Sequence, residues 1–231
     1  MQGKNRLYEQ KFFQNVARDT ADKLWAAGSI REFPAGHVLM RAKDCTSQVY
    51  IQLSGKSMVY NLTHMGKRKI IFLFGGGVLL NEHVMNAHPA SLFCETIEKS
   101  RIFSVPLKLF LQCMEEDFTL TRAVLETQEC RIWRLGHQLK NTQGGIYMER
   151  KLAAKLWKLS RDFGIQKPDG IEIDINLSVT MLADMLGSSR ETTSRLCSIL
   201  IDLGLMKINK KRITIINPEK MSVFYKTGET E

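Results

Sequence analysis

The segment from residue 178 to 212 restricts the possible folds of this chain more than any other. The apolar run VTMLADML is followed by the polar cluster GSSRETTSRL and then by the apolar run CSILIDLGLM. Ser178 is the predicted N-cap of a first short helix, and Gly187 ends that helix. Ser188 begins a second helix and is followed three residues later by Glu191, the spacing of a capping box. Two short helices joined at a glycine predict a helix-turn-helix.

The second helix is predicted to be amphipathic. Leu196, Ile199, Leu200 and Leu203 recur at i, i+3, i+4 and i+7, so we expect them to form its buried face. Its N-terminal end is polar, and in a helix-turn-helix this end reaches base edges in the major groove of DNA. Arginine can bind guanine in bidentate fashion, glutamate can accept from cytosine N4, and hydroxyls can bind phosphates. The predicted DNA contacts in these two helices are Ser178, Ser188, Ser189, Arg190, Glu191, Thr192, Ser194 and Arg195.

A basic hairpin follows the two helices. LMKINKKRITIIN predicts two strands joined at Asn209-Lys210-Lys211, a wing that lies along the DNA backbone. Its predicted contacts are Lys210, Lys211 and Arg212. Residues 187–212 hold six Lys or Arg and two acidic residues, a local charge of 6 − 2 = +4. The alternative, a capped surface helix whose arginines are only solvated, is disfavoured by the succession of helix, glycine turn, capped helix and basic hairpin.

Residues 30–106 have the pattern of a β-rich domain. Short, partly alternating apolar runs such as VYIQLSG, SMVYNLT and KIIFLF are separated by Gly, Asn, Asp and Lys. Even spacing of such runs is typical of a β-sandwich or β-roll. The preceding QNVARDTADKLWAAG is predicted to be a helix that ends at Gly28. The run Gly75-Gly76-Gly77 predicts a strand-ending turn, because no phosphate-loop motif surrounds it.

A long helix is predicted over about residues 107–142, where Gly136 is the only glycine and proline is absent. Starting at Phe118, apolar positions recur at alternating three- and four-residue steps, the pattern of a helix that pairs with a like partner. Thr121 and Gln128 are the polar positions of this seam. The alternative is a helix packed on its own β-domain. The predicted dimer interface is Leu125, Gln128, Ile132, Leu135 and Leu139.

The chain is predicted to be an α+β protein of two domains, residues 1–143 and residues 144–231, with a hinge at Gly144-Gly145. An amphipathic helix over residues 146–163 opens the second domain. Its predicted inward residues are Leu152, Leu156, Trp157 and Leu159. GIQKPDG is predicted to be a loop and IEIDINL a short strand.

Charge and cysteine use limit the compartment and the partners. The net charge of +9 favours an acidic partner such as nucleic acid or an anionic membrane. The five cysteines are scattered and never spaced as C-x-x-C, which is typical of reduced thiols in the cytoplasm. The sequence lacks an apolar run long enough for a membrane span, and its first residues lack the apolar core of a signal peptide, so a membrane partner is not expected.

The sequence does not predict a metal site, a redox switch or an active site. His83 and His88 are five residues apart, which fits neither common metal-binding spacing, so no metal is expected. Cys94 and Cys113 are expected to be small buried residues, with a redox switch as the alternative. The sequence shows no nucleophile–base pair or paired carboxylates, so we do not expect an enzyme. The rival hypotheses are a metal-dependent β-barrel enzyme and a ligand-controlled scaffold that binds proteins.

The segment SSRETTSRL resembles the recognition-helix signature of the cyclic-AMP receptor protein and fumarate–nitrate regulator (Crp/Fnr) superfamily. The order of β-rich domain, long helix, hinge and winged helix-turn-helix is similar to that superfamily over nearly the whole chain. The resemblance implies a homodimeric transcription regulator, an activator that contacts RNA polymerase, binds pseudo-palindromic double-stranded DNA and senses a small effector in a cyclic-nucleotide-binding-like β-roll. It also implies that Arg190, Glu191 and Arg195 read bases.

Two departures from the superfamily pattern bear on the effector. Where nucleotide-binding members carry Gly-Glu-Leu and Arg-Ser, this chain has Asn81-Glu82-His83 and Ala90-Ser91, so a bound phosphate would lack its cation. No cysteine precedes Cys45, which argues against an iron–sulfur cluster. Cyclic AMP is therefore not expected, and the residues identify neither an effector nor a cofactor. The expected lining of the effector pocket is Leu80, Glu82, Ser91, Gln128 and Arg131.

Overall fold

The computed structural model of the chain describes residues 5–86, 88–140 and 147–229. The chain forms two compact units. The N-terminal unit comprises Met1–Thr63 and Ile70–Leu135, and the C-terminal unit comprises His64–Lys69 and Gly136–Glu231. The predicted hinge at Gly144-Gly145, and with it the predicted boundary at 143/144, lies outside the described residues.

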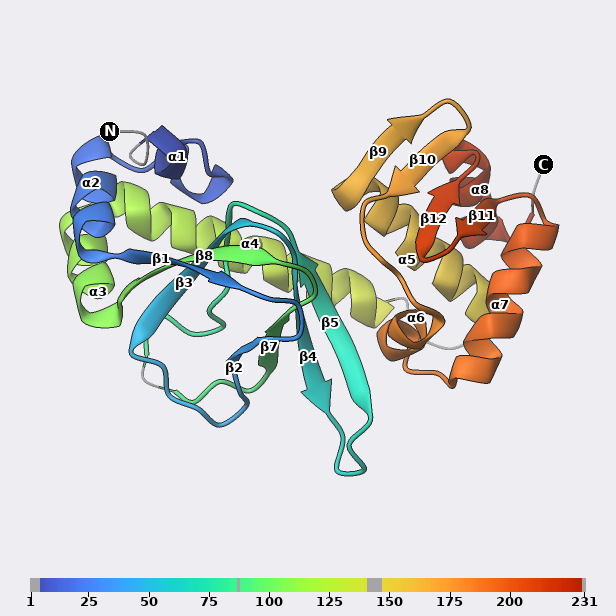
Figure 1. The fold of residues 1–231 in the computed structure, drawn as a ribbon, viewed down its shortest axis with the longest axis horizontal. Coiled ribbons are helices and arrows are strands. Elements are labelled where there is room, and N and C mark those ends of the chain that lie inside the picture. The colour runs from blue at the N-terminus through green and yellow to red at the C-terminus, as the bar shows by residue number, and fades with distance from the viewer. Residues whose placement is uncertain (1–4, 87, 141–146, 230–231) are drawn as a thin grey trace. The chain divides into compact units, whose positions relative to one another are not determined.

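The N-terminal unit contains a β-roll made of two four-stranded sheets (Figure 1). The first sheet has the order β1 (Ser29–Phe33), β8 (Ser100–Pro106), β3 (Gln48–Ser54) and β6 (Val78–Leu79). The second has the order β2 (Val38–Met40), β7 (Phe93–Thr96), β4 (Ser57–Leu62) and β5 (Arg68–Phe74). The β-roll predicted for residues 30–106 is confirmed.

Alternate residues of the first sheet face two different cores. Val49, Ile51 and Phe103 are fully buried against the helices of this unit. Ile102, one position along β8, points to the other core, between the two sheets, where it packs with Phe72. The helical elements on the first side are α1 (Asn5–Tyr8), a 3-10 turn (Lys11–Phe13), α2 (Arg18–Ala27) and α3 (Leu107–Glu116). Period-two alternation therefore explains how one sheet supports both cores.

The predicted helix over residues 107–142 is two helices, because the chain breaks at Asp117. Asp117 has an extended backbone with φ −133° and separates α3 from α4 (Phe118–Lys140). Its carboxylate accepts hydrogen bonds from the backbone N–H of Thr119, at 2.8 Å, and from the Thr119 hydroxyl, at 2.6 Å. An aspartate in this position satisfies a free N–H at the start of the following helix, which favours a new helix over continuation.

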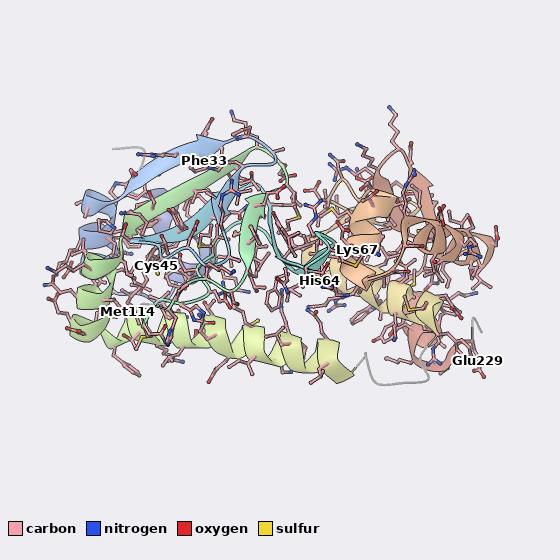
Figure 2. All side chains as sticks on the ribbon, turned by 90° about the horizontal axis from the view of Figure 1, so that it is seen from below. Phe33, Cys45, His64, Lys67, Met114 and Glu229 are labelled. Atoms are coloured by element: carbon pink, nitrogen blue, oxygen red, sulfur yellow. The ribbon has the colours of Figure 1, made fainter. Side chains whose placement is uncertain are left out.

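Helix α4 packs on its own β-roll and still leaves an apolar stripe exposed to solvent. Leu120, Ala123 and Val124 are buried in the core between the first sheet and the helices. The predicted seam lies on another face, where Ile132 is 68% exposed and Leu139 is 67% exposed. Beyond Arg131 the described side chains of α4 are exposed or half-buried, and Gly136 lies within this stretch. Figure 2 shows side chains of α4 projecting on the side away from the roll.

The C-terminal unit combines helices with a second kind of sheet. Its helices are α5 (Met148–Phe163), α6 (Val179–Leu186), α7 (Arg190–Asp202) and α8 (Pro218–Thr227). The sheet has the order β11 (Met206–Asn209), β12 (Arg212–Ile215), β10 (Gly170–Ile173) and β9 (Gly164–Lys167). Of the residues predicted to point inward from α5, Leu152, Leu156 and Leu159 are buried, and Trp157 is half-buried.

Two elements of this unit were not predicted. Residues 164–167, expected to be part of a loop, form β9, which pairs with β10 from Gly164 opposite Ile173 to Lys167 opposite Gly170. Helix α8 begins after Asn217, whose side chain caps it by accepting from the Lys220 N–H at 2.9 Å. The sequence signal for α8 was the Asn217-Pro218 pair, because asparagine at the N-cap and proline at the first position start helices.

Candidate nucleic-acid interface

The turn between α6 and α7 has the geometry predicted for a helix-turn-helix. The Ser178 hydroxyl accepts from the Met181 N–H at 3.1 Å and so caps α6. Gly187 ends α6 with φ +73°, a left-handed conformation that side chains with a Cβ rarely adopt. The predicted cap and glycine turn are confirmed.

Helix α7 begins one residue later than predicted. Its N-cap is Ser189, whose hydroxyl accepts from the Thr192 N–H at 3.0 Å. The backbone N–H of Ser188 instead donates to the Ala183 carbonyl at 3.1 Å and closes the preceding helix. The predicted capping box of Ser188 and Glu191 is therefore wrong, since the third residue after the actual cap is Thr192. Glu191 remains exposed in the first turn of α7.

The buried face of α7 is shifted toward its N-terminus. Thr193, Leu196, Cys197 and Leu200 are buried, and the Thr193 hydroxyl donates to the Ser189 carbonyl at 2.9 Å. Ile199 and Leu203, predicted to point inward, are exposed. Leu203 falls beyond the last residue of α7, and the 193/196/197/200 spacing supplies the i, i+3, i+4, i+7 stripe.

The opposite face of α7 is polar and exposed. Arg190, Glu191, Ser194 and Arg195 are exposed, as predicted. In the described part of the chain neither arginine forms an ion pair or a side-chain hydrogen bond. Ser198 extends the same face and is also exposed. Ser198, whose hydroxyl donates to the Ser194 carbonyl at 3.4 Å, was not predicted, although the helical period from Ser194 places it on this face.

The remaining predicted residues of the second helix start are less free. The Ser189 hydroxyl also donates to the Thr192 hydroxyl at 2.9 Å, and Thr192 is half-buried. Ser178, Ser188 and Thr192 are thus partly buried and in contact with their own helices. Ser188 and Thr192 lie within two residues of Arg190, whereas Ser178 lies at the start of α6, and the hydroxyl or backbone amide of each takes part in helix capping.

The wing exposes two of its three predicted cations. The turn between β11 and β12 has Lys210 in a left-handed conformation with φ +57°, and the Lys211 carbonyl accepts from the Leu177 N–H at 2.8 Å. Lys210 and Lys211 are exposed. Arg212, predicted to contact the DNA backbone, forms an ion pair with Asp174 at 2.6 Å. That carboxylate competes with any phosphate for Arg212.

The five predicted effector residues lie together in the N-terminal unit. The Glu82 carboxylate accepts from the Ser91 backbone N–H at 2.9 Å and from the Ser91 hydroxyl. The Gln128 side-chain amide donates to the Glu82 carbonyl at 3.4 Å. Leu80 is buried in the core between the sheets. Gln128 thus faces the roll, and its second assignment, to the dimer seam, is weakened by this bond.

Arg131 links α4 to the backbone of residues 79–81, next to Glu82. Its guanidinium donates to the Asn81 carbonyl at 2.6 Å and to the Leu79 carbonyl, and it lies over the Phe74 ring at 5.1 Å. The side chain is only 9% exposed, and its Nε finds no hydrogen-bond partner among the described residues. Burial lowers the pKa of Arg131 to about 10. A buried guanidinium bonded to neutral carbonyls marks this region as favourable for an anion.

Comparison with known proteins gives the same two-part organisation. Residues 30–117 match the cyclic nucleotide-binding domain, and residues 150–224 match the Crp-like helix-turn-helix domain. The global nitrogen regulator of Nostoc sp. is 32% identical over 220 residues, which cover 93% of this chain and 96% of that protein. The chain belongs to the Crp/Fnr family of transcription regulators.

Other proteins similar to this Crp/Fnr regulator match it over most of its length. The global nitrogen regulator of Synechococcus elongatus is 29% identical, covering 84% of this chain and 88% of that protein. Among solved structures, the c-di-GMP responsive global regulator CLP of Xanthomonas campestris has a TM-score of 0.75 at 16% identity, covering 87% of this chain and 100% of that one. FixK2 of Bradyrhizobium japonicum has a TM-score of 0.73 at 17% identity, covering 84% and 96%. These two structures show the shared fold.

Family membership decides between the rival hypotheses. The matches are transcription regulators with a DNA-binding domain and an effector-binding domain, so this Crp/Fnr member is a DNA-binding regulator and the β-barrel enzyme hypothesis is rejected. The family is typically dimeric. Among the described residues no three His, Cys, Asp or Glu side chains group as a metal site, and no helix there is long and apolar enough to cross a membrane.

The cysteine switch hypothesis finds no support in this Crp/Fnr regulator. Cys94 is buried between the two sheets, and burial raises the pKa of its thiol to about 12. Cys113 is buried in the other core, and burial raises its pKa as well. Both thiols are thus kept protonated, and a thiolate is the reactive form.

The run Gly75-Gly76-Gly77 forms the predicted turn between strands. Gly77, the last of the run, has φ +74° and donates its N–H to the Gln52 carbonyl at 2.7 Å.

Proposed function

We propose that this regulator acts as a homodimer that reads a pseudo-palindromic duplex through α7 and pairs through α4. The observation that carries the proposal is the exposed, cationic face of α7 opposite a fully packed one. Arg190 and Arg195 have no acidic partner within the described residues, so their guanidinium groups are available to an external acceptor. On a two-fold axis, two such helices enter major grooves about 34 Å apart, one helical turn.

Each exposed residue of α7 has a distinct expected role. Arg190 and Arg195 bind guanine O6 and N7, and Glu191 accepts from cytosine N4. Ser194 contacts a phosphate, as do the serines and threonine at the helix start, Ser178, Ser188, Ser189 and Thr192. Lys210 and Lys211 of the wing neutralise phosphates, which raises affinity for every sequence. Arg212 contributes less because Asp174 already neutralises it.

The homodimer rests on the seam of α4. Leu125, Ile132, Leu135 and Leu139 are all exposed in the single chain, although Leu120 and Val124 of the same helix are buried. A helix whose second apolar stripe remains bare is typical of one that packs on a like partner. The exposure of these four residues favours dimerisation over the alternative, in which they would pack on the β-roll of their own chain.

The effector pocket consists of Leu80, Glu82, Ser91, Gln128 and Arg131, and its ligand is a small molecule other than cyclic AMP. Both donors of Ser91 already serve the Glu82 carboxylate and position 90 is alanine, so a phosphate at Ser91 would meet a negative charge there. The one cation among the five residues is Arg131, whose guanidinium already donates to the Asn81 and Leu79 carbonyls. An iron–sulfur cluster has no cysteines to bind it before Cys45.

We further propose that the dimer activates transcription by contacting RNA polymerase in the cytoplasm.

Selection of bound duplexes from a random pool tests the proposal. The intact protein is expected to enrich sites with two inverted half-sites about 10 base pairs apart, centre to centre. The double variant Arg190→Ala/Arg195→Ala is expected to lose this enrichment, and Lys167→Ala, an exposed cation on β9, serves as the matched control. Retention that is insensitive to salt, or no retention of DNA at all, contradicts the proposal and favours a protein-binding scaffold.

A further inference from the structure

The β-roll has a cleft that no predicted site uses. It has a volume of about 540 Å³ and lies over the first sheet and β2. Figure 2 labels Phe33 of β1, which is one of its lining residues. The polar part of the lining includes Arg31, His37, Gln48 and Tyr50. The cleft shares no lining residue with the predicted effector pocket.

Strand register explains how these side chains reach one surface. Arg31 pairs with Ile102, and Tyr50 pairs with Ser104, across the ladders β1–β8 and β3–β8. Paired residues point to the same face of a sheet. The intervening residues, such as Val49 and Phe103, fill the helical core on the other face. The cleft therefore has a rigid floor set by backbone hydrogen bonds.

The charge of the cleft is one-sided. Its lining contains one guanidinium and one imidazole but no Asp or Glu side chain. Within the described residues Arg31 forms no ion pair, whereas Glu32, its neighbour in sequence, pairs with Lys99 at 2.7 Å. The side chains of Gln48 and Tyr50 likewise make no hydrogen bond to the described part of the chain. Three polar groups thus converge on the cleft with unused donors.

One wall of the cleft is flat and aromatic. The rings of Phe33 and His37 stack at 4.4 Å between centroids with an interplanar angle of 22°. Leu39 and Ile102 add aliphatic surface to the same lining. A concave site with an apolar surface and a few convergent polar groups is the usual form of a small-molecule site.

We propose that this cleft is a second ligand site, for a small organic anion with one carboxylate and a flat apolar body. Arg31 binds the carboxylate in bidentate fashion, with Tyr50 and Gln48 as further donors. The body of the ligand lies against Phe33, His37 and Ile102. This assignment goes beyond the proposed function, because neither DNA reading nor the Arg131 pocket involves these residues.

Fluorine NMR of 4-fluorobenzoate with the full-length protein tests the assignment. We expect saturable broadening of the probe signal, and no saturable broadening for the neutral analogue 4-fluorobenzyl alcohol. Arg31→Gln is expected to weaken binding about tenfold, and Arg31→Lys to weaken it less, because lysine keeps the charge but not the bidentate geometry. Arg41→Gln, an exposed arginine of the same unit outside the cleft, is the matched control.

A further variant separates this site from the effector pocket. Tyr50→Phe removes a donor that belongs to the cleft and not to the predicted effector pocket, and it is expected to weaken binding of 4-fluorobenzoate. The assignment is overturned if the probe does not bind saturably, if the alcohol binds equally well, or if Arg31→Gln and Tyr50→Phe both leave binding unchanged. Arg31 is exposed, so its substitution is expected to leave the melting temperature nearly unchanged, which confirms that the variant is folded.

Discussion

Helices α4 and α7 are both buried on one face and bare on another, but their bare faces have opposite chemistry. The bare face of α4 is a stripe of leucine and isoleucine, and that of α7 carries arginine, glutamate and serine. An apolar stripe gains free energy only when another apolar surface covers it. A cationic face loses little by staying in water and gains from a polyanion. The two helices therefore indicate two different partners, a second copy of the chain and DNA.

The different chemistry of the two exposed faces also suggests that dimerisation precedes DNA binding. In the proposed dimer each α7 presents one short reading surface, so a single chain would reach only half of a palindrome. Pairing through α4 would join the two reading surfaces and make the second contact intramolecular. Dimerisation by α4 is therefore expected to dominate DNA affinity, and individual contacts of α7 to set sequence preference.

The largest effect is expected from breaking the α4 stripe. Ile132→Glu places a charge in the apolar seam, so we expect monomers in analytical ultracentrifugation and about a 100-fold or greater loss of affinity for the selected duplex. Glu129→Gln, exposed on the same helix, is the control and is expected to remain dimeric. A dimer that survives Ile132→Glu would place the interface elsewhere.

The next effect concerns base reading by α7. Arg190→Ala is expected to cost about 1–3 kcal/mol on the selected duplex and to relax preference at one base pair per half-site. Fluorescence anisotropy with matched and single-mismatch duplexes measures both. Equal losses on specific and random duplexes would show that Arg190 contacts phosphate and not a base.

A smaller effect separates the two serines before α7. Ser189→Ala removes the N-cap and is expected to lower the free energy of unfolding by about 1 kcal/mol. Ser188→Ala is expected to change it by less than about 0.5 kcal/mol, because the Ser188 backbone closes α6 and its hydroxyl caps nothing. Denaturant titration of both variants checks the order, and the reverse ranking would restore the predicted capping box.

The smallest effect is expected at the wing. Lys211→Ala is expected to weaken binding to all duplexes by a similar factor and to reduce the salt dependence by about one unit. Arg212→Ala is expected to leave the salt dependence unchanged, because Asp174 neutralises Arg212 in the folded chain. Titrations at several salt concentrations distinguish the two, and a change of slope in Arg212→Ala would mean that DNA displaces Asp174.

The sequence was sufficient wherever a local rule decides the structure. The glycine turn at Gly187, the Ser178 cap and the exposed start of α7 follow from capping and helical period within a few residues. The two adjacent serines did not reveal which of them caps α7, because the choice depends on which N–H closes the preceding helix. The break at Asp117 was missed because the apolar pattern runs through it, and the pattern alone does not show that this aspartate caps a new helix.

Contacts between residues far apart in the sequence could not be predicted from local patterns. The ion pair of Arg212 with Asp174 joins residues 38 positions apart, and no local pattern predicts it. Likewise β9 forms because β10 provides a partner, although its own sequence, GIQK, has no strand alternation. The five residues predicted for the effector pocket lie near one another in the structure, and their role stays a prediction. The hydrogen bonds between Ser91 and Glu82 depend on side-chain geometry that the sequence does not show.

The exposed end of α4 has a consequence for the single chain in dilute solution. From Ile132 to Leu139 no side chain is buried, and Gly136 lowers the intrinsic helix propensity of that stretch. So short a segment does not hold a helix in water unaided. We therefore expect the last two turns of α4 to unwind when the protein is diluted until its subunits separate, so that circular dichroism reports subunit association as a gain of helix.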